Sequence, residues 1–94
     1  MTKINKAVVQ SLWIGPELSA IEQLAINSFL KNGHEFHLYT YDKVKNIPEG
    51  TTIKDANEII NSSEIFLYKK SYATFADWFR WEIIYKKGNF WVDM

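Results

Sequence analysis

Two carboxylates and one guanidinium in the last third of the chain are the side chains most able to do chemistry. Asp77 and Arg80 lie three residues apart in a segment with helical patterning, and Asp93 follows the apolar run 90–92. Ligands of α/β sheets usually bind at the carboxyl ends of the strands. If Asp93 ends a strand beside that helix, the three residues form a candidate ligand site.

The elements around these residues decide whether they meet. The pattern predicts a helix over 72–87, a Gly-Asn turn, and a strand over 90–92. A helix rises about 1.5 Å per residue and a strand about 3.3 Å. The turn reverses the chain, so Asp93 should return to about the level of Asp77 and Arg80.

Asp77 and Arg80 also fit a plain alternative, a surface ion pair worth about 0.2–0.5 kcal/mol. Against this, the predicted helix is apolar on nearly all sides, which indicates that it is largely buried. Buried charges are rarely left without a partner or a task. Both interpretations stay open at the level of sequence.

The first forty residues predict a strand–helix–strand unit. A mostly apolar, β-branched run over 6–15 ends at Gly-Pro and is typical of a strand covered on both faces. A helix over 19–32 begins with a capping box formed by Ser19 and Glu22, and an alternating aromatic run at 35–41 is typical of a second strand. This spacing predicts a mainly parallel sheet and an α/β fold.

The middle of the chain carries weaker patterns. Residues 42–50 form a predicted loop with Asn, Pro and Gly, and 55–60 could be a short helix. The apolar patch 65–68 is either a short helix or an irregular segment that packs under the last helix.

Composition limits the class of protein and its partners. Residues 1–94 suffice for a single small domain, and 47% hydrophobic residues argue against disorder. The 11 basic and 11 acidic side chains leave no net charge, so we expect no nucleic-acid partner. There is no cysteine and no long apolar run. We therefore expect a cytoplasmic protein with no transmembrane segment, with peripheral attachment to a membrane as an alternative.

Taken together, the motifs resemble the N-terminal part of bacterial glycosyltransferases that carry a DXD sugar-binding region. The chain is similar to their capsular polysaccharide and mannosyltransferase-like group, which is distantly related to clostridial glucosylating toxins. The matching motifs are L-W-I-G at 12–15, Y-T-Y-D at 39–42, A-T-F-A-D-W-F-R at 73–80, I-I-Y-K-K-G-N at 83–89 and F-W-V-D at 90–93. The resemblance implies a GT-A fold, a Rossmann-like sheet that binds a nucleotide-diphosphate sugar such as a UDP- or GDP-sugar.

The resemblance also implies roles for the nucleotide-binding side chains. Trp13, Ile14 and Gly15 would line the nucleobase and ribose pocket, although a core position is the plain alternative for Trp13. Trp91 would form a wall of the pocket. Asp77 would bind hydroxyl groups of the sugar or ribose.

Two further positions would act on the diphosphate in such an enzyme. Arg80 would lie by the donor sugar and diphosphate, where a planar guanidinium suits oxygen-rich anions. Asp93 would be the first acid of the metal motif. Through it, Mn²⁺ or Mg²⁺ would bridge to the diphosphate and offset the charge on the leaving group. The resemblance does not identify a catalytic residue in this chain.

The sequence departs from the family pattern at three points. Asn89 replaces the second glycine of a usual pair, and Ala76 stands where serine is common. The metal motif needs a second acid two residues after Asp93, but the sequence ends at Met94. The chain therefore looks truncated, and we expect it to be inactive on its own, without the glycan acceptor site.

A second class of function stays open. The chain could be a non-catalytic remnant, or a small α/β interaction module that contacts a protein through its aromatic side chains. That partner could be a second copy of the chain covering an open side of the sheet.

Overall fold

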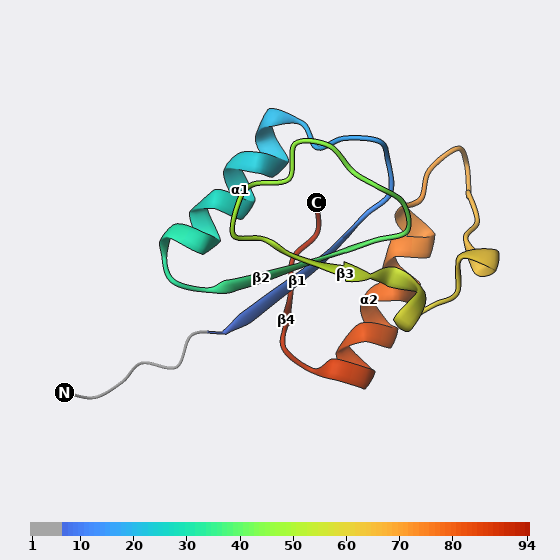
Figure 1. Cartoon of the computed structure of the whole chain (residues 1–94). Helices are drawn as coiled ribbons and strands as arrows, with labels where there is room; N and C mark the ends of the chain where they lie inside the picture. Colours follow the sequence, from blue (N-terminus) through green and yellow to red (C-terminus); the bar gives the residue numbers. More distant parts are fainter. Residues whose placement is uncertain (1–6) are drawn as a thin grey trace.

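Four parallel strands form one sheet in the order β3-β2-β1-β4, so β1 lies in its interior (Figure 1). The computed structural model describes residues 7–94. Its strands are β1 (Val8–Trp13), β2 (Glu35–Thr40), β3 (Thr52–Asp55) and β4 (Phe90–Trp91). The α/β class and the parallel sheet are confirmed, and the strand order is compatible with a Rossmann-like arrangement. The predicted strand 6–15 is shorter than expected, and Lys6 lies outside the described residues.

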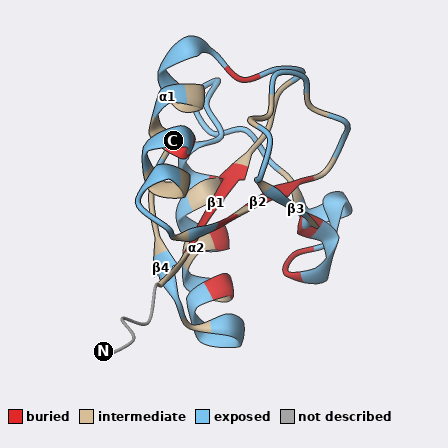
Figure 2. Ribbon diagram, turned by 60° about the vertical axis from the view of Figure 1, so that its left-hand side comes forward, coloured by how far each residue is buried: buried red, intermediate tan, exposed pale blue. Residues whose placement is uncertain are grey.

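The two α-helices, α1 (Ala20–Lys31) and α2 (Ala73–Lys87), cover opposite faces of the sheet (Figure 1). Side chains of β1 alternate between the two cores: Val9 packs in the α1 core and Leu12 in the α2 core. Figure 2 shows the buried residues on β1 and along one side of α2. The strand is thus covered on both faces, as its apolar run predicted.

The helix α1 begins at the predicted capping box. The Ser19 backbone N–H donates to Glu22 Oε1 at 2.9 Å, and the Ser19 hydroxyl donates to the same oxygen. These hydrogen bonds hold the pKa of Glu22 below its ordinary value. The helix turns Ile26 into the core, whereas Ile21 and Leu24 are exposed.

The helix α2 corrects the expectation of a largely buried helix. Only the side formed by Phe75, Phe79 and Ile83 reaches the sheet, and these three side chains are fully buried. Phe79 contacts Tyr39 at 5.8 Å between ring centroids and Trp91 at 6.1 Å. The opposite side is largely exposed, because within residues 7–94 the one aromatic contact that another segment makes with it comes from Phe66, which stacks on Trp78. The prediction that this helix is largely buried is therefore wrong, although its residues are apolar on nearly all sides.

The short strand β4 is held to β1 by side chains as well as by its ladder. Gln10 Nε2 donates to the carbonyl of Gly88 at 2.8 Å, and the Ser11 hydroxyl donates to the carbonyl of Val92 at 2.7 Å. Both residues of β1 are almost fully buried. Gly88 ends α2 with a φ of 68°, the left-handed conformation that its lack of a Cβ permits. The predicted helix–turn–strand is confirmed.

The middle segment differs from its prediction. The strand β3 was missed, and the expected short helix at 55–60 is a single 3₁₀ turn, η1 (Ala56–Glu58). A second 3₁₀ turn, η2 (Ser62–Glu64), leads into the irregular patch 65–68. The strand lacks an apolar pattern because it lies at the sheet edge with three of its four residues exposed.

Two side chains fasten the end of η1 beneath α2. Lys86 Nζ donates to the carbonyl of Ile59, and the Tyr41 hydroxyl donates to that of Ile60, both at 2.7 Å. Burial, aided by the nearby Asp55 carboxylate, raises the pKa of Tyr41 to about 12.

Candidate functional site

A crevice opens where the strand order reverses, between the carboxyl ends of β1 and β4. The chain runs from β1 to β2 and β3 on one side, and then crosses to β4 on the other side. Such a switch point is where open α/β sheets bind ligands. Two adjoining hollows of about 250 and 220 Å³ make up this crevice. It is lined by Leu12, Trp13, Ile14, Ser71, Tyr72, Ala73, Ala76, Asp77, Trp91, Asp93 and Met94.

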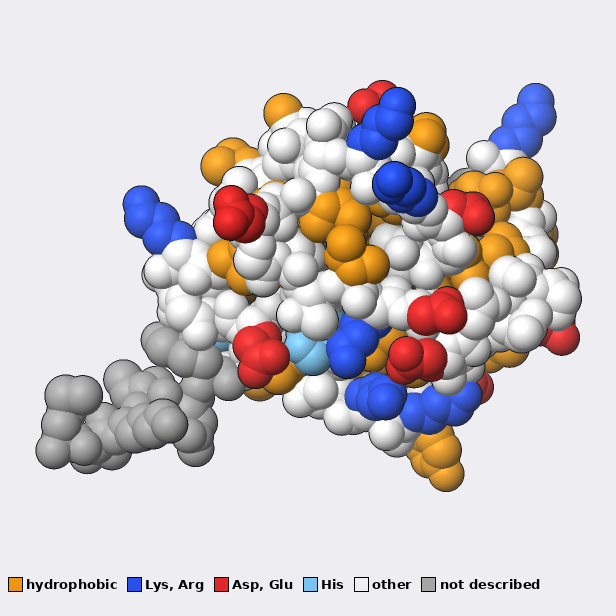
Figure 3. All heavy atoms as spheres, in the orientation of Figure 1, with side chains coloured by type: hydrophobic (Ala, Val, Ile, Leu, Met, Phe, Trp, Pro, Cys, Tyr) orange, Lys and Arg blue, Asp and Glu red, His pale blue; other side chains and the backbone are white. Residues whose placement is uncertain are grey.

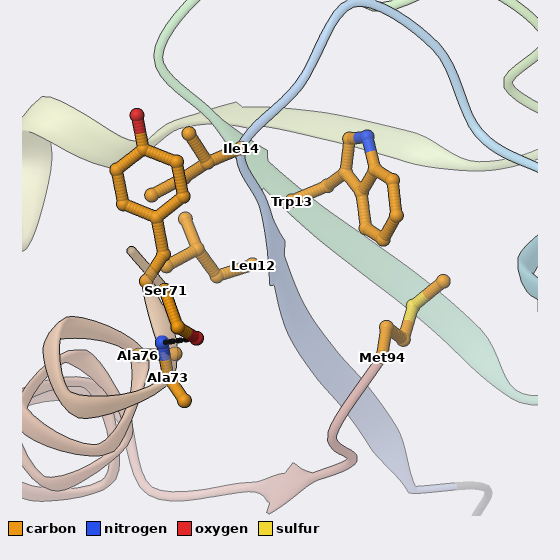
Figure 4. A pocket seen from close by; sticks show the side chains of 8 residues that line it. Leu12, Trp13, Ile14, Ser71, Ala73, Ala76 and Met94 are labelled. Carbon is orange, nitrogen blue, oxygen red and sulfur yellow. Dashed lines mark hydrogen bonds between the residues drawn. The ribbon is translucent and has the colours of Figure 1, made fainter. Parts of the chain in front are cut away.

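The end of β1 supplies the apolar wall of the crevice. Figure 4 shows Leu12 and Ile14 turned toward α2, whereas Trp13 and Met94 lie on the other side of the strand. The indole N–H of Trp13 donates to the carbonyl of Glu17 at 3.0 Å, which orients the ring. Trp13 is half-buried and also packs against the α1 core, as the structural interpretation expects. Its contact with a ligand stays a prediction.

Gly15 supports this wall from behind and does not line it. A Cβ at this position would come within 3.2 Å of Trp13 Nε1, and its φ is 154°. A side chain there would therefore press on the tryptophan ring. The predicted contact between Gly15 and a ligand stays a prediction.

The acidic part of the crevice joins three predicted residues. Asp77 on α2 and Asp93 after β4 line the same hollow, together with Trp91. The indole N–H of Trp91 donates to Asp93 Oδ1 at 2.7 Å, which leaves Oδ2 of that carboxylate for a ligand. The estimate that the chain returns Asp93 to the level of Asp77 is confirmed by this shared wall.

Arg80 does not reach the crevice wall. Its guanidinium lies 3.8 Å from Asp77 Oδ1 and 5.5 Å from the ring of Trp81, on the outer side of α2. The ion pair that was the plain alternative is therefore present. It coexists with the crevice, because Asp77 takes part in both.

The beginning of α2 forms a side of the crevice that sequence reasoning missed. Ser71, Tyr72, Ala73 and Ala76 line it. The Ala73 backbone N–H donates to Ser71 Oγ at 3.0 Å, the hydrogen bond drawn in Figure 4. The sequence could have indicated this side of the crevice. Small residues at the start of a helix allow the backbone to approach a ligand closely. Ala76 in particular leaves room where a larger side chain would fill the hollow.

The charges of the lining decide which ligands it accepts. Two carboxylates line the crevice, and none of its described lining residues is Lys or Arg. Hydroxyl groups can donate to carboxylates, but a phosphate would meet negative charge without compensation. An anionic ligand therefore needs an accompanying cation in this crevice.

The residues present fit such a cation only in part. Within residues 7–94 no three His, Cys, Asp or Glu side chains are grouped as a metal cage. Mg²⁺ is commonly held by one or two carboxylates together with substrate phosphates. Asp93, with one oxygen free, fits a cation that arrives with a diphosphate and is retained by both.

A third hollow, of about 350 Å³, lies near the amino ends of β1 and β4, facing α1. It is larger than either part of the crevice. Its lining is apolar apart from His34, whose Nδ1 lies 3.2 Å from the carbonyl of Ala7. It offers no carboxylate and no hydroxyl, so the crevice is the better candidate for a polar ligand.

Comparisons with known proteins identify no relative whose site could be compared with this one. No family model matches the chain, and no curated protein and no solved structure matches it. Within residues 7–94, neither α-helix has the length and hydropathy that a membrane-spanning segment requires.

Proposed function

We propose that the chain is the donor-binding part of a glycosyltransferase that uses a nucleotide-diphosphate sugar. One observation carries the proposal: Asp77 and Asp93 share a crevice with an apolar wall at the topological switch point of a parallel sheet. The complete enzyme would transfer the sugar to a glycan acceptor in polysaccharide biosynthesis. The motif resemblance supports the same assignment.

The two parts of the crevice suit the two ends of such a donor. A planar base would pack over the carboxyl end of β1, with Leu12 and Ile14 on one side of the strand and Trp13 on the other (Figure 4). Hydroxyl groups of ribose or sugar would donate to the carboxylate of Asp77. Arg80 would act through Asp77, because its guanidinium is paired with that carboxylate and not with the crevice.

The diphosphate would depend on a divalent cation. Mn²⁺ or Mg²⁺ supplies the positive charge that offsets the diphosphate as it leaves. In this chain Asp93 would hold the cation through Oδ2, while Trp91 fixes Oδ1. The indole hydrogen bond keeps the carboxylate directed into the crevice.

A thermal-shift titration of the 94-residue chain tests the proposal. UDP, GDP and their sugars would each be added with and without Mn²⁺. A ligand at ten times its Kd adds about 1.4 kcal/mol of stability, which raises the Tm of a domain of this size by about 5 °C or more. We expect a shift for one nucleotide series, and only in the presence of the metal.

Matched variants decide where the ligand binds. Asp77→Asn and Asp93→Asn should each reduce the shift, and Asp93→Asn should also remove its dependence on Mn²⁺. Glu49→Gln, an exposed acid in the loop before β3, serves as the control and should leave the shift unchanged. Equal shifts in all three variants would refute a donor site in the crevice.

A second candidate, an interaction module without catalytic activity, is favoured by a different observation. The outer side of α2 exposes large aromatic side chains, among them Trp81 and Tyr85. A folded chain that binds no nucleotide under any of these conditions would support this candidate in place of the first.

A further inference from the structure

The outer side of α2 carries an aromatic stripe. Trp78, Trp81 and Tyr85 follow one another at intervals of three and four residues, which brings them onto one face of the helix. Trp81 is 66% exposed and Tyr85 is 87% exposed. This face points away from the core, because the buried face of α2 is the one formed by Phe75, Phe79 and Ile83.

The segment before α2 adds further exposed hydrophobic side chains next to the stripe. Phe66 stacks on Trp78, with ring centroids 6.5 Å apart and planes inclined by 30°. Leu67 and Tyr68 follow Phe66 and are more than half exposed. Figure 3 shows hydrophobic side chains gathered where the chain leads from η2 to α2, at the right of the view. We call this surface the outer patch; it consists of Phe66, Leu67, Tyr68, Trp78, Trp81 and Tyr85.

The outer patch is about as large as the largest apolar patches that soluble monomers leave open. A large aromatic side chain covers about 150–250 Å², so the exposed fractions of these six residues correspond to on the order of 600 Å². Soluble monomers rarely expose contiguous apolar patches above a few hundred Å². A stable interface buries about 800 Å² on each partner. The outer patch with a polar rim therefore reaches the size that one side of a dimer interface requires.

The charges beside the outer patch favour a partner with the same surface. Each flank of the stripe carries a pair of opposite sign, Asp77 with Arg80 at 3.8 Å and Glu82 with Lys86 at 3.9 Å. The whole chain has no net charge. Two copies would therefore approach without mutual repulsion, whereas a strongly charged partner would find no complementary field.

We propose that the outer patch is a self-association surface on which a second copy of this chain docks, stripe against stripe, about a two-fold axis. Such a contact is isologous, because the same residues serve on both sides. Trp and Tyr are the residue types that most often carry the affinity of an interface. None of the six residues lines the crevice, and Asp77 alone borders both the crevice and the flank of the stripe.

Sedimentation equilibrium of the 94-residue chain tests the proposal. We expect a monomer–dimer equilibrium with a Kd in the micromolar range. Trp81→Glu, at the middle of the stripe, should raise that Kd by about 30-fold or more, as expected when a central aromatic anchor is lost. Leu24→Glu is the matched control, because Leu24 is 72% exposed on a different helix, and it should not change the Kd.

The four tryptophans provide a second measurement that needs no substitution. On dilution, the indole N–H resonances of Trp78 and Trp81 should shift as the dimer dissociates, while those of Trp13 and Trp91 should stay in place. A chain that is monomeric at every concentration would overturn the proposal, including one that instead binds lipid vesicles through Trp81. A dimer whose Kd is unchanged in Trp81→Glu would also overturn it. The same holds for a dimer that Leu24→Glu weakens as much as Trp81→Glu does.

Discussion

The two strands beside β1 are attached to it in different ways. β2 pairs with β1 over six residue positions, and the connecting helix α1 starts with its own capping box. β4 pairs over two positions only, and the first turn of α2 has no capping box but a single hydrogen bond from the Ala73 N–H to Ser71 Oγ. The second attachment relies instead on Gln10, Ser11 and the aromatic side of α2. The α2–β4 half, which carries Asp77 and Asp93, therefore depends more on individual side chains than the α1–β2 half does.

The largest expected effect comes from the aromatic contact that joins α2 to both neighbours of β1. Phe79→Ala removes a fully buried ring that packs against Tyr39 and Trp91. We expect it to lower the free energy of unfolding by about 3–5 kcal/mol, measured by urea denaturation. Phe90→Ala is the control, because Phe90 is 64% exposed and should cost far less. Equal losses in the two variants would contradict the role given to the α2 core.

A smaller and more local effect is expected at the join between β1 and β4. Ser11→Ala removes the hydroxyl that donates to the Val92 carbonyl. The free energy of unfolding should fall by about 1 kcal/mol. Hydrogen exchange should accelerate at the Val92 N–H, which donates to the carbonyl of Gln10. Ser28→Ala, on the exposed side of α1, should leave the exchange rate of the Val92 N–H unchanged. If this variant accelerates that exchange as much as Ser11→Ala does, the effect of Ser11→Ala is not specific to the contact between β1 and β4.

The smallest expected effect concerns the α1–β2 half and depends on pH. Hydrogen bonds from Ser19 lower the pKa of Glu22 in the folded state, so the folded chain binds this proton less readily than the unfolded chain. The stabilisation is present above the ordinary pKa of 4.5 and is lost as pH falls through the lower folded value. Glu22→Gln should therefore reduce stability at pH 7. As pH drops below 4.5, the stability of the variant should fall less than that of the unsubstituted chain. Thermal unfolding from pH 7 to 3 measures this, and identical pH profiles would exclude the contribution.

The sequence predicts what depends on local patterns. The β1–α1–β2 unit, the capping box and the helix–turn–strand at Gly88 all follow from residues close together in the chain. The meeting of Asp77 with Asp93 also followed, because the rise per residue of a helix and of a strand sets it.

Other features depend on partners far away in the chain. β3 is an edge strand defined by its backbone pairing with β2, so its side chains carry little signal. Gln10 and Ser11 are buried polar residues whose acceptors lie 78 and 81 positions later. The side of α2 that faces the sheet, and with it the position of Arg80 outside the crevice, could not be read from a helix that is apolar all round.

The measurement that tests the central claim most directly is the response of the four indole N–H resonances to a nucleotide-diphosphate sugar and Mg²⁺. The indole of Trp91 is bound to Asp93, and the ring of Trp13 borders the crevice, whereas Trp78 and Trp81 lie on the outer side of α2. A ligand in the crevice should shift Trp91 most and Trp13 next, and should leave the other two in place. If millimolar UDP- and GDP-sugars leave Trp13 and Trp91 unmoved, or move only Trp78 and Trp81, the crevice is not the donor site.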